Sequence, residues 1–183
     1  MKYIYTTILI IALISGCGSL PDKKTSVASV AALDELVAGR SFEIVSNWAF
    51  PLMTRGITSV ANSGLLLPGS NANRIDLIGN SNYLRVKGDS VYVSLPYFGE
   101  RQIGGRYGDS DVGIKVEGVP REYQVEKDVK KNSYRIEFRI KDEIESLQFF
   151  LTLFPSGKAD INVNSTHRSS IRYSGTAKSL GED

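Results

Sequence analysis

The sequence holds one cysteine, Cys17, and one histidine, His167, which are the two residue types that most readily act as nucleophile or general base near neutral pH. His167 lies in a segment rich in Ser, Thr, Asn and Arg, where a solvent-facing turn residue is a better interpretation than a general base. The chain contains no G-x-S-x-G, Walker A, H-E-x-x-H or EF-hand pattern. We therefore predict a protein that is not an enzyme and that binds no cofactor.

One pair of acids, Asp109 and Asp111, stands in a glycine-rich stretch and offers two oxygen ligands of the kind that calcium prefers. The remaining spaced acids of a calcium loop are missing. A local turn, in which an aspartate side chain hydrogen-bonds its own backbone, is the preferred interpretation. No metal site is predicted.

Cys17 follows a segment with the layout of an export signal. Lys2 supplies a positive charge, residues 3–14 form an apolar run, and Ser15-Gly16 places small residues before the cysteine. The apolar run is shorter than the roughly 20 residues that a membrane-spanning helix needs. Its end resembles the lipobox of bacterial lipoproteins, in which the thiol becomes a thioether to diacylglycerol. A plain signal peptide with a chance cysteine is the less favoured alternative, because the chain has no other cysteine.

Lipidation of Cys17 would make residues 1–16 a signal peptide and residues 17–25 a lipidated tether. More than one acyl chain anchors a protein stably in a membrane. Gly18-Ser19-Leu20 lacks an acidic run of the kind that resembles a surface-export signal, so the expected location is the outer membrane, facing the periplasm. Removing 16 residues from the 183 leaves 167 and takes the formal charge from +2 to +1, which gives no electrostatic case for binding nucleic acid.

The stretch from Leu95 to Val112 is the strongest candidate for a ligand or partner site. A long loop inside a compact domain is often functional, and here aromatic side chains and arginines stand among glycines. The alternative is that the first two aromatic residues plug one end of a sheet while the glycines serve tight turns, and this is the preferred interpretation. The candidate binding residues are Tyr97, Phe98, Arg101, Arg106 and Tyr107.

A helix is predicted over residues 26–38, because apolar residues recur there at helical spacing and Gly39 follows as a C-terminal glycine. The rest of the chain is predicted to be mostly strand. A single β-rich domain is expected over residues 26–176, and a polar tail over residues 177–183.

From Ser41 the apolar period changes to two, and a strand starting at Phe42 fades near Pro51. Residues 53–82 are rich in glycine and asparagine and are predicted to be mostly loop. A last strand is expected over residues 170–174.

Four hairpin registers follow from the rule that directly opposed residues share a face of the sheet. One of them is strained, because it also places Lys127 opposite Ile136 and Glu126 opposite Glu137. The predicted pairs are Leu84–Val93 and Val86–Val91 around Gly88-Asp89; Tyr123–Ile140 and Val125–Phe138 around Lys131-Asn132; Phe138–Phe149 and Ile140–Leu147 around 142–145; and Phe149–Val163 and Leu151–Ile161 around 155–157.

These elements predict a mainly β (α+β) fold: a curved antiparallel meander or half-barrel with the N-terminal helix packed on its dry face. Phe150 and Phe154 fall on the opposite face, which is therefore expected to be partly covered or offered to a ligand.

Short motifs spread over the chain resemble the DUF4251 family of envelope lipoproteins. The resemblance covers roughly residues 32–175 and implies a β-rich fold, but it brings no catalytic residues and no assigned activity. The motifs are Asn73-Arg74-Ile75, residues 83–89, residues 95–99, Tyr107-Gly108, Gly113-Ile114, Glu117-Gly118, residues 153–157 and residues 168–171.

Three functions are compatible with these features. The preferred one is a membrane-anchored, non-enzymatic binding or accessory module for an apolar or envelope-derived ligand, expected to be a monomer. The second is a structural or assembly partner that docks another envelope protein through an exposed edge strand or the Tyr97–Tyr107 loop. The third, a hydrolase with an unrecognised site, is the least favoured because no catalytic constellation is evident.

Overall fold

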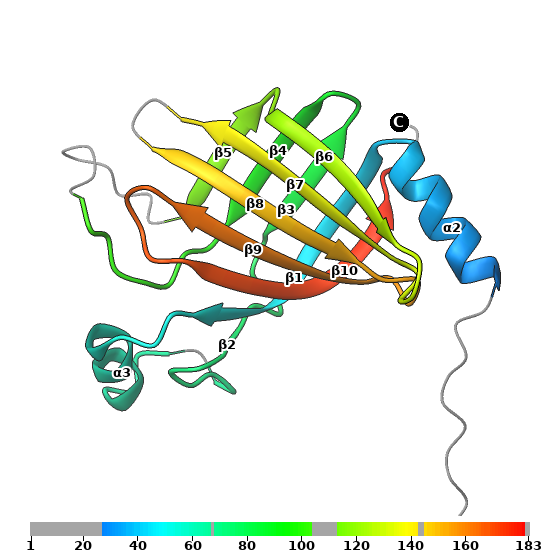
Figure 1. The fold of residues 1–183 in the computed structure, drawn as a ribbon. Helices are drawn as coiled ribbons and strands as arrows, with labels where there is room; N and C mark the ends of the chain where they lie inside the picture. Colours follow the sequence, from blue (N-terminus) through cyan, green and yellow to red (C-terminus); the bar gives the residue numbers. More distant parts are fainter. Residues whose placement is uncertain (1–26, 67, 104–112, 143–144, 182–183) are drawn as a thin grey trace, which may run out of the picture.

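The computed structural model describes residues 27–66, 68–103, 113–142 and 145–181. Nine strands form one curled antiparallel sheet in the order β5-β4-β3-β1-β10-β9-β8-β7-β6, and β2 pairs with β1 beside it (Figure 1). The elements are α2 (Val27–Ala38), β1 (Ser41–Pro51), α3 (Arg55–Asn62), β2 (Ile75–Asp76), β3 (Tyr83–Lys87), β4 (Ser90–Leu95), β5 (Ile114–Gly118), β6 (Arg121–Asp128), β7 (Ser133–Lys141), β8 (Ser146–Leu153), β9 (Lys158–Ser165) and β10 (Ile171–Ser179).

The predicted half-barrel is confirmed. In Figure 1 the strands β6 to β10 form one layer and β3 to β5 cross behind it at a steep angle. Apolar positions of β3, β4 and β7 to β10 point into the space between the layers, which is filled by the protein's own side chains, whereas Val125 of β6 is exposed. Phe138 stacks on Phe149 with 5.0 Å between ring centroids, and Tyr123 stacks on the other side of Phe138 at 5.8 Å.

Strand β1 is central to the sheet because it belongs to both layers. It pairs with β10 along nearly its whole length, whereas it pairs with β3 only through Ser41–Ile44 and with β2 only at Trp48 and Ala49. A bulge between Ser46 and Trp48 lies where β3 has left it. Bulges bend a strand and increase its twist, so this one turns β1 from one layer toward the other.

Two residues make the bulge possible. The Asn82 amide takes the place of a neighbouring strand: its Oδ1 accepts from Ser46 N at 2.8 Å, and its Nδ2 donates to Ser46 O at 2.9 Å. Gly175 faces Ser46 from β10, and a Cβ there would lie 2.0 Å from the carbonyl oxygen of Val45. The close approach of the two backbones therefore excludes any residue with a side chain.

Helix α2 ends at Ala38, as predicted, and packs on the sheet through the buried Leu33 and Val37. Asp34 holds it there by accepting from Lys127 Nζ at 2.6 Å and from Tyr134 Oη at 2.8 Å. The hydrogen bond from Lys127, followed by that from Tyr134, lowers the pKa of the Asp34 carboxyl. The left-handed residue after the helix is Arg40, with φ 46°, although Gly39 was the residue expected to end it.

Three of the four predicted registers are confirmed, and the β6–β7 register is wrong by two residues. Val125 lies opposite Ile136, and Glu126 lies opposite Arg135 rather than Glu137. The turn is longer than assumed, because Asp128 Oδ1 accepts from the amides of Lys130 and Lys131 at 3.0 and 3.1 Å. A shift of two residues keeps each side chain on its face, and it replaces the like-charge pair with an opposite-charge one.

Two expectations about the less regular segments are corrected. The stretch 53–82 contains helix α3, which Thr54 caps by accepting from Ile57 N at 3.3 Å, with Ile57 buried beneath it. Strand β10 runs to Ser179, not to 174, because the first residues of β1 continue the ladder and pair Phe42 with Ser179. Residues 177–179 of the expected tail therefore belong to the sheet.

The bulge in β1 gives the first testable prediction. Asn82→Ala leaves the buried N–H and C=O of Ser46 without partners, so we expect it to lower the free energy of unfolding by about 2–3 kcal/mol. Asn164→Ala, at an exposed position on β9, is the matched control and should change it by less than about 0.5 kcal/mol. Urea unfolding of the two variants measures the difference, and equal midpoints would contradict this role for Asn82.

Candidate functional site

The loop after β4 starts as part of the core. Tyr97 is 6% exposed, and its hydroxyl lies 2.8 Å from Ser169 Oγ and 3.0 Å from the Ser169 carbonyl oxygen. Burial is the main cause that raises the pKa of Tyr97. Phe98 is half-buried and packs against the core cluster. Both aromatic rings therefore plug one end of the sheet, which is the interpretation preferred from the sequence.

The next candidate residue, Arg101, is half-buried and forms an isolated bridge with Arg168. Main-chain hydrogen bonds from Gln102 N to His167 O and from Ser169 N to Glu100 O tie the two segments together. The structure thus ties two of the five predicted residues, Tyr97 and Arg101, to the β9–β10 connection, and it packs Phe98 against the core. Arg106 and Tyr107, like the acids Asp109 and Asp111, lie outside the described residues.

A buried ion pair holds this end of the barrel together. Arg168 donates from Nη2 to Glu145 Oε1 at 2.7 Å and from Nε to Glu145 Oε2 at 3.1 Å, with the two side chains 7% and 4% exposed. Arg168 Nη1 also donates to the carbonyl oxygen of Gly113 at 2.7 Å, and Ser165 Oγ donates to Glu145 Oε2 at 2.7 Å. The pair therefore joins the segments before β8, before β10 and before β5.

Sequence reasoning missed this pair, since single charged residues in polar loops carry no periodic signal. The burial of both charges is tolerated because nearly all of their donor and acceptor groups are hydrogen-bonded. The pair has a structural position rather than an accessible one, so it sets the shape of the barrel end and does not itself face a ligand.

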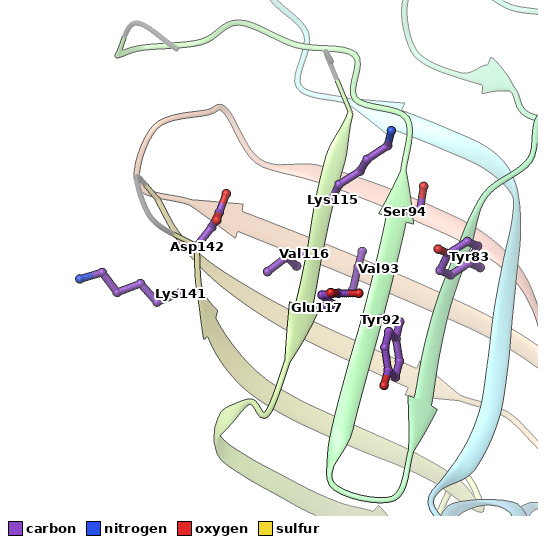
Figure 2. A pocket seen from close by; sticks show the side chains of 9 residues that line it. All are labelled: Tyr83, Tyr92, Val93, Ser94, Lys115, Val116, Glu117, Lys141 and Asp142. Carbon is purple, nitrogen blue, oxygen red and sulfur yellow. The ribbon is translucent and has the colours of Figure 1, made fainter. Parts of the chain in front are cut away.

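An accessible concave surface lies along β5, where the sheet begins. Strands β5 and β6 are the two ends of the strand order, and the chain turns sharply between them. Gly118 has φ 142°, Glu122 has φ 56°, and Pro120 stands between them, so the two strands diverge instead of pairing. A groove of about 520 Å³ opens between β5 and the end of β7 (Figure 2).

The groove combines an apolar floor with a charged and aromatic rim. Figure 2 shows Val116 pointing from β5 toward Asp142, whereas Lys141 points away from β5. Val93 lies beside Val116 as its direct strand partner. The other lining residues come from the outer surface of β3, β4 and β5: Tyr83, Tyr92, Ser94, Lys115 and Glu117.

The main chain of β5 offers hydrogen-bonding groups on the outer side of the groove. The two-residue turn after Lys87 makes Lys87 and Ser90 the closing pair of the β3–β4 hairpin, so on β4 the main-chain groups of Val93 face β5. Because Val93 pairs with Val116, the alternation directs the N–H and C=O of Glu117 away from β4 and toward the outer edge.

A network of charges supports the outer surface beside the groove. Glu43 is 6% exposed on β1 and accepts hydrogen bonds from Arg85 and from Lys178 Nζ, the latter at 3.1 Å. Burial pushes the pKa of Glu43 upward, but the hydrogen bonds from Arg85 and Lys178 outweigh it and hold the pKa below its usual value. Arg85 in turn stacks on the Tyr83 ring, with Cζ 4.0 Å from the ring centroid, and so orders one wall of the groove.

Sequence reasoning did not select these groove residues. One signal was present, since the β3–β4 register already placed Tyr92 opposite Arg85 on the polar face. What could not be predicted is that β5 lies at the sheet end, because strand order is set by contacts between distant segments. Within the described ranges there is no cluster of three metal-ligating side chains. The same ranges contain no helix long and apolar enough to cross a membrane.

The fold is therefore a curled antiparallel β half-barrel with a filled interior and a groove at one sheet edge. Residues 24–177 match the family described as "Domain of unknown function (DUF4251)", and the chain belongs to this family. The resemblance noted from the sequence motifs is thus confirmed.

A solved relative has a similar fold. It is the crystal structure of a DUF4251 family protein from Bacteroides eggerthii DSM 20697, with 18% sequence identity and a TM-score of 0.57 over 86% of this chain and 92% of the other. This level of identity supports the shared fold alone. No curated protein matches the sequence.

The buried ion pair gives the second prediction. Glu145→Gln leaves the Arg168 charge buried without its counter-ion, and we expect it to lower the free energy of unfolding by about 3 kcal/mol. Glu122→Gln, which removes a partner from an exposed ion pair with Arg139, is the control and should cost less than about 1 kcal/mol.

A double-mutant cycle tests whether the two charges act as a unit. Arg168→Met should cost about as much as Glu145→Gln, and the double variant should cost less than the sum by at least about 1 kcal/mol. Chemical denaturation of the four proteins supplies the numbers. Strictly additive effects would show that Glu145 and Arg168 do not depend on each other.

Proposed function

We propose that this protein is a non-enzymatic binding module, anchored in the outer membrane by lipid on Cys17 and facing the periplasm. Its partner is an extended segment of another envelope protein, which adds to the sheet along β5. The non-enzymatic part of the proposal rests on the sequence, which has one histidine and one cysteine and none of the common catalytic motifs.

The filled interior favours binding on the outside. Folds that carry acyl chains need a cavity between their layers, and here large side chains such as Phe42, Phe138, Phe149 and Tyr173 occupy that space. The surface groove beside β5 is bounded by charges and hydroxyl-bearing rings. A peptide segment brings main-chain and side-chain hydrogen-bonding groups that suit such a polar rim, whereas an apolar small molecule brings none, so a peptide segment is the better occupant.

The position of β5 at the end of the sheet is the observation that carries the proposal. An extended segment can continue a sheet edge by forming main-chain hydrogen bonds, while its side chains enter alternate pockets. The Glu117 N–H and C=O point to this edge, and Val116 gives the incoming segment an apolar contact. Lys115 and Glu117 place one charge of each sign on the edge strand, and charged side chains on an edge limit indiscriminate pairing with other sheets.

Support for the anchor comes from the sequence before the domain. Cys17 and the expected tether lie outside the described residues, and α2 begins ten residues after the cysteine at Val27. A chain of that length spans at most about 35 Å when fully extended. The domain would therefore work within a short distance of the lipid surface, where other envelope proteins are anchored.

Photocrosslinking in intact cells tests the binding edge. A benzophenone amino acid in place of Tyr92, which is exposed beside the groove, should give one discrete adduct. Glu117→Pro removes the outward N–H and should lower the adduct yield by about tenfold, since both a hydrogen bond and close approach are lost.

Glu117→Ala is the matched control, because it removes the same carboxylate but keeps the N–H, and it should retain most of the adduct. Thermal unfolding of both variants checks that the sheet is intact. Equal yields from the two variants, or a diffuse smear from the Tyr92 position, would rule out strand addition at β5.

A further inference from the structure

The segment from Pro51 to Asn82 forms a lobe, here named the apolar lobe. In Figure 1 it projects from the end of β1, below the sheet, and carries α3 and β2. Its buried side chains Ile57, Ile75 and Leu77 belong to the same core cluster as the sheet, and it presents other apolar side chains outward. Five of the ten exposed large apolar side chains in the described residues belong to it: Leu52, Met53, Val60, Leu65 and Ile78.

Two of these apolar side chains are exposed over most of their surface. Leu65 is 78% exposed and Ile78 is 71% exposed, although both stand next to folded segments. Scattered apolar residues need no explanation, but a concentration of them in one protruding lobe marks a contact with a membrane or another protein.

The charges of the apolar lobe favour a lipid surface over a protein. The stretch from Pro51 to Arg74 contains no acidic residue and two exposed arginines, Arg55 and Arg74. The one acid of the lobe, Asp76, turns its Oδ1 to the main chain of Ile78 at 2.8 Å. One carboxylate from outside the lobe, that of Glu100, lies against Gly56 of α3. Apolar side chains beside two arginines still match an interface of acyl chains and anionic headgroups.

The position of the expected anchor agrees with this arrangement. In Figure 1 the first turn of α2 and the apolar lobe point to the same side of the sheet, whereas the corner between β5 and β6 lies on the other side. The ten-residue separation between Cys17 and Val27 keeps that side within about 35 Å of the lipid.

We infer that the apolar lobe dips into the lipid–water interface and forms a second membrane contact beside the lipid anchor, leaving the β5 groove turned away from the membrane. This inference rests on the proposed anchoring at Cys17. Two contacts restrict the tilt and rotation of the domain, which a single flexible tether would leave free.

A fluorescent probe at Leu65 tests the inference in the lipidated protein. The lipid consumes the thiol of Cys17, so Leu65→Cys supplies the single reactive thiol for an environment-sensitive dye. Val119→Cys is the matched control, since Val119 is an exposed apolar residue at the β5–β6 corner, 69% exposed. Both proteins are reconstituted into vesicles of phosphatidylethanolamine and phosphatidylglycerol, with and without brominated acyl chains.

The probe at Leu65 should shift to shorter emission wavelengths and lose intensity roughly twofold with brominated lipid, while the probe at Val119 should keep its emission in water. Water-like emission at both positions would overturn the inference. A blue shift at Leu65 without quenching would show a protein neighbour or a second copy, and it too would overturn the inference.

Mass spectrometry of the protein purified from its own membranes separates this result from the anchor itself. If Cys17 carries lipid but the probe at position 65 emits as in water, the second membrane contact is refuted and the proposed function stands. If Cys17 carries no lipid, the proposed anchoring is refuted. In that case Cys17→Ser is added to both labelled variants, so that the introduced cysteine is again the single thiol, and the chains are added to preformed vesicles; the absence of quenching at position 65 again overturns the contact.

Discussion

The sheet curls into two layers because β1 bends at Ser46. A sheet of nine strands can bury one complete face only if it curls, and β1 is the strand that runs through both layers. Asn82 supplies the hydrogen bonds that β3 no longer provides there, and Gly175 lets the neighbouring backbone approach. The layers then close on each other around large side chains such as Phe138 and Phe149, which favours binding on the surface.

The ends of the sheet follow from the same curvature. Once the layers cross, β5 and β6 are brought to a common corner, and the backbone conformations of Gly118 and Glu122 separate them again. The groove beside β5 is therefore a consequence of an incompletely closed barrel. At the other end of β1, the strand continues beyond its contact with β3 to Pro51, and the apolar lobe grows from that extension.

Local patterns in the sequence were sufficient to predict the strand register where neighbouring strands are joined by short turns. Alternation of apolar residues around Gly88-Asp89 gave the β3–β4 register, and the same argument worked for β7, β8 and β9. It failed at the β6–β7 turn because a side chain, Asp128, stabilises a longer loop than the apolar pattern implies. The alternation of apolar and polar residues is unchanged by a shift of two residues. The predicted face of each side chain was therefore correct although the register was not.

Features that depend on distant contacts could not be predicted. The end of β10 is polar and becomes a strand only because the first residues of β1 pair with it. The ion pair of Glu145 and Arg168 joins two different loops, and no periodic pattern in the sequence links them. The groove depends on which strand lies at the end of the sheet. Tyr97 and Phe98 were candidate binding residues because they are aromatic residues in a glycine-rich stretch. In the structure both rings pack against the core at the barrel end.

Amide hydrogen exchange tests whether a partner segment continues the sheet at β5. The exchange of the peptide covering Ile114–Gly118 is compared between the protein in its own isolated membranes and the purified lipidated protein. Strand addition predicts selective slowing of exchange at β5 in the membranes, with the Glu117 amide included. Identical exchange of this peptide in the two samples would contradict the claim.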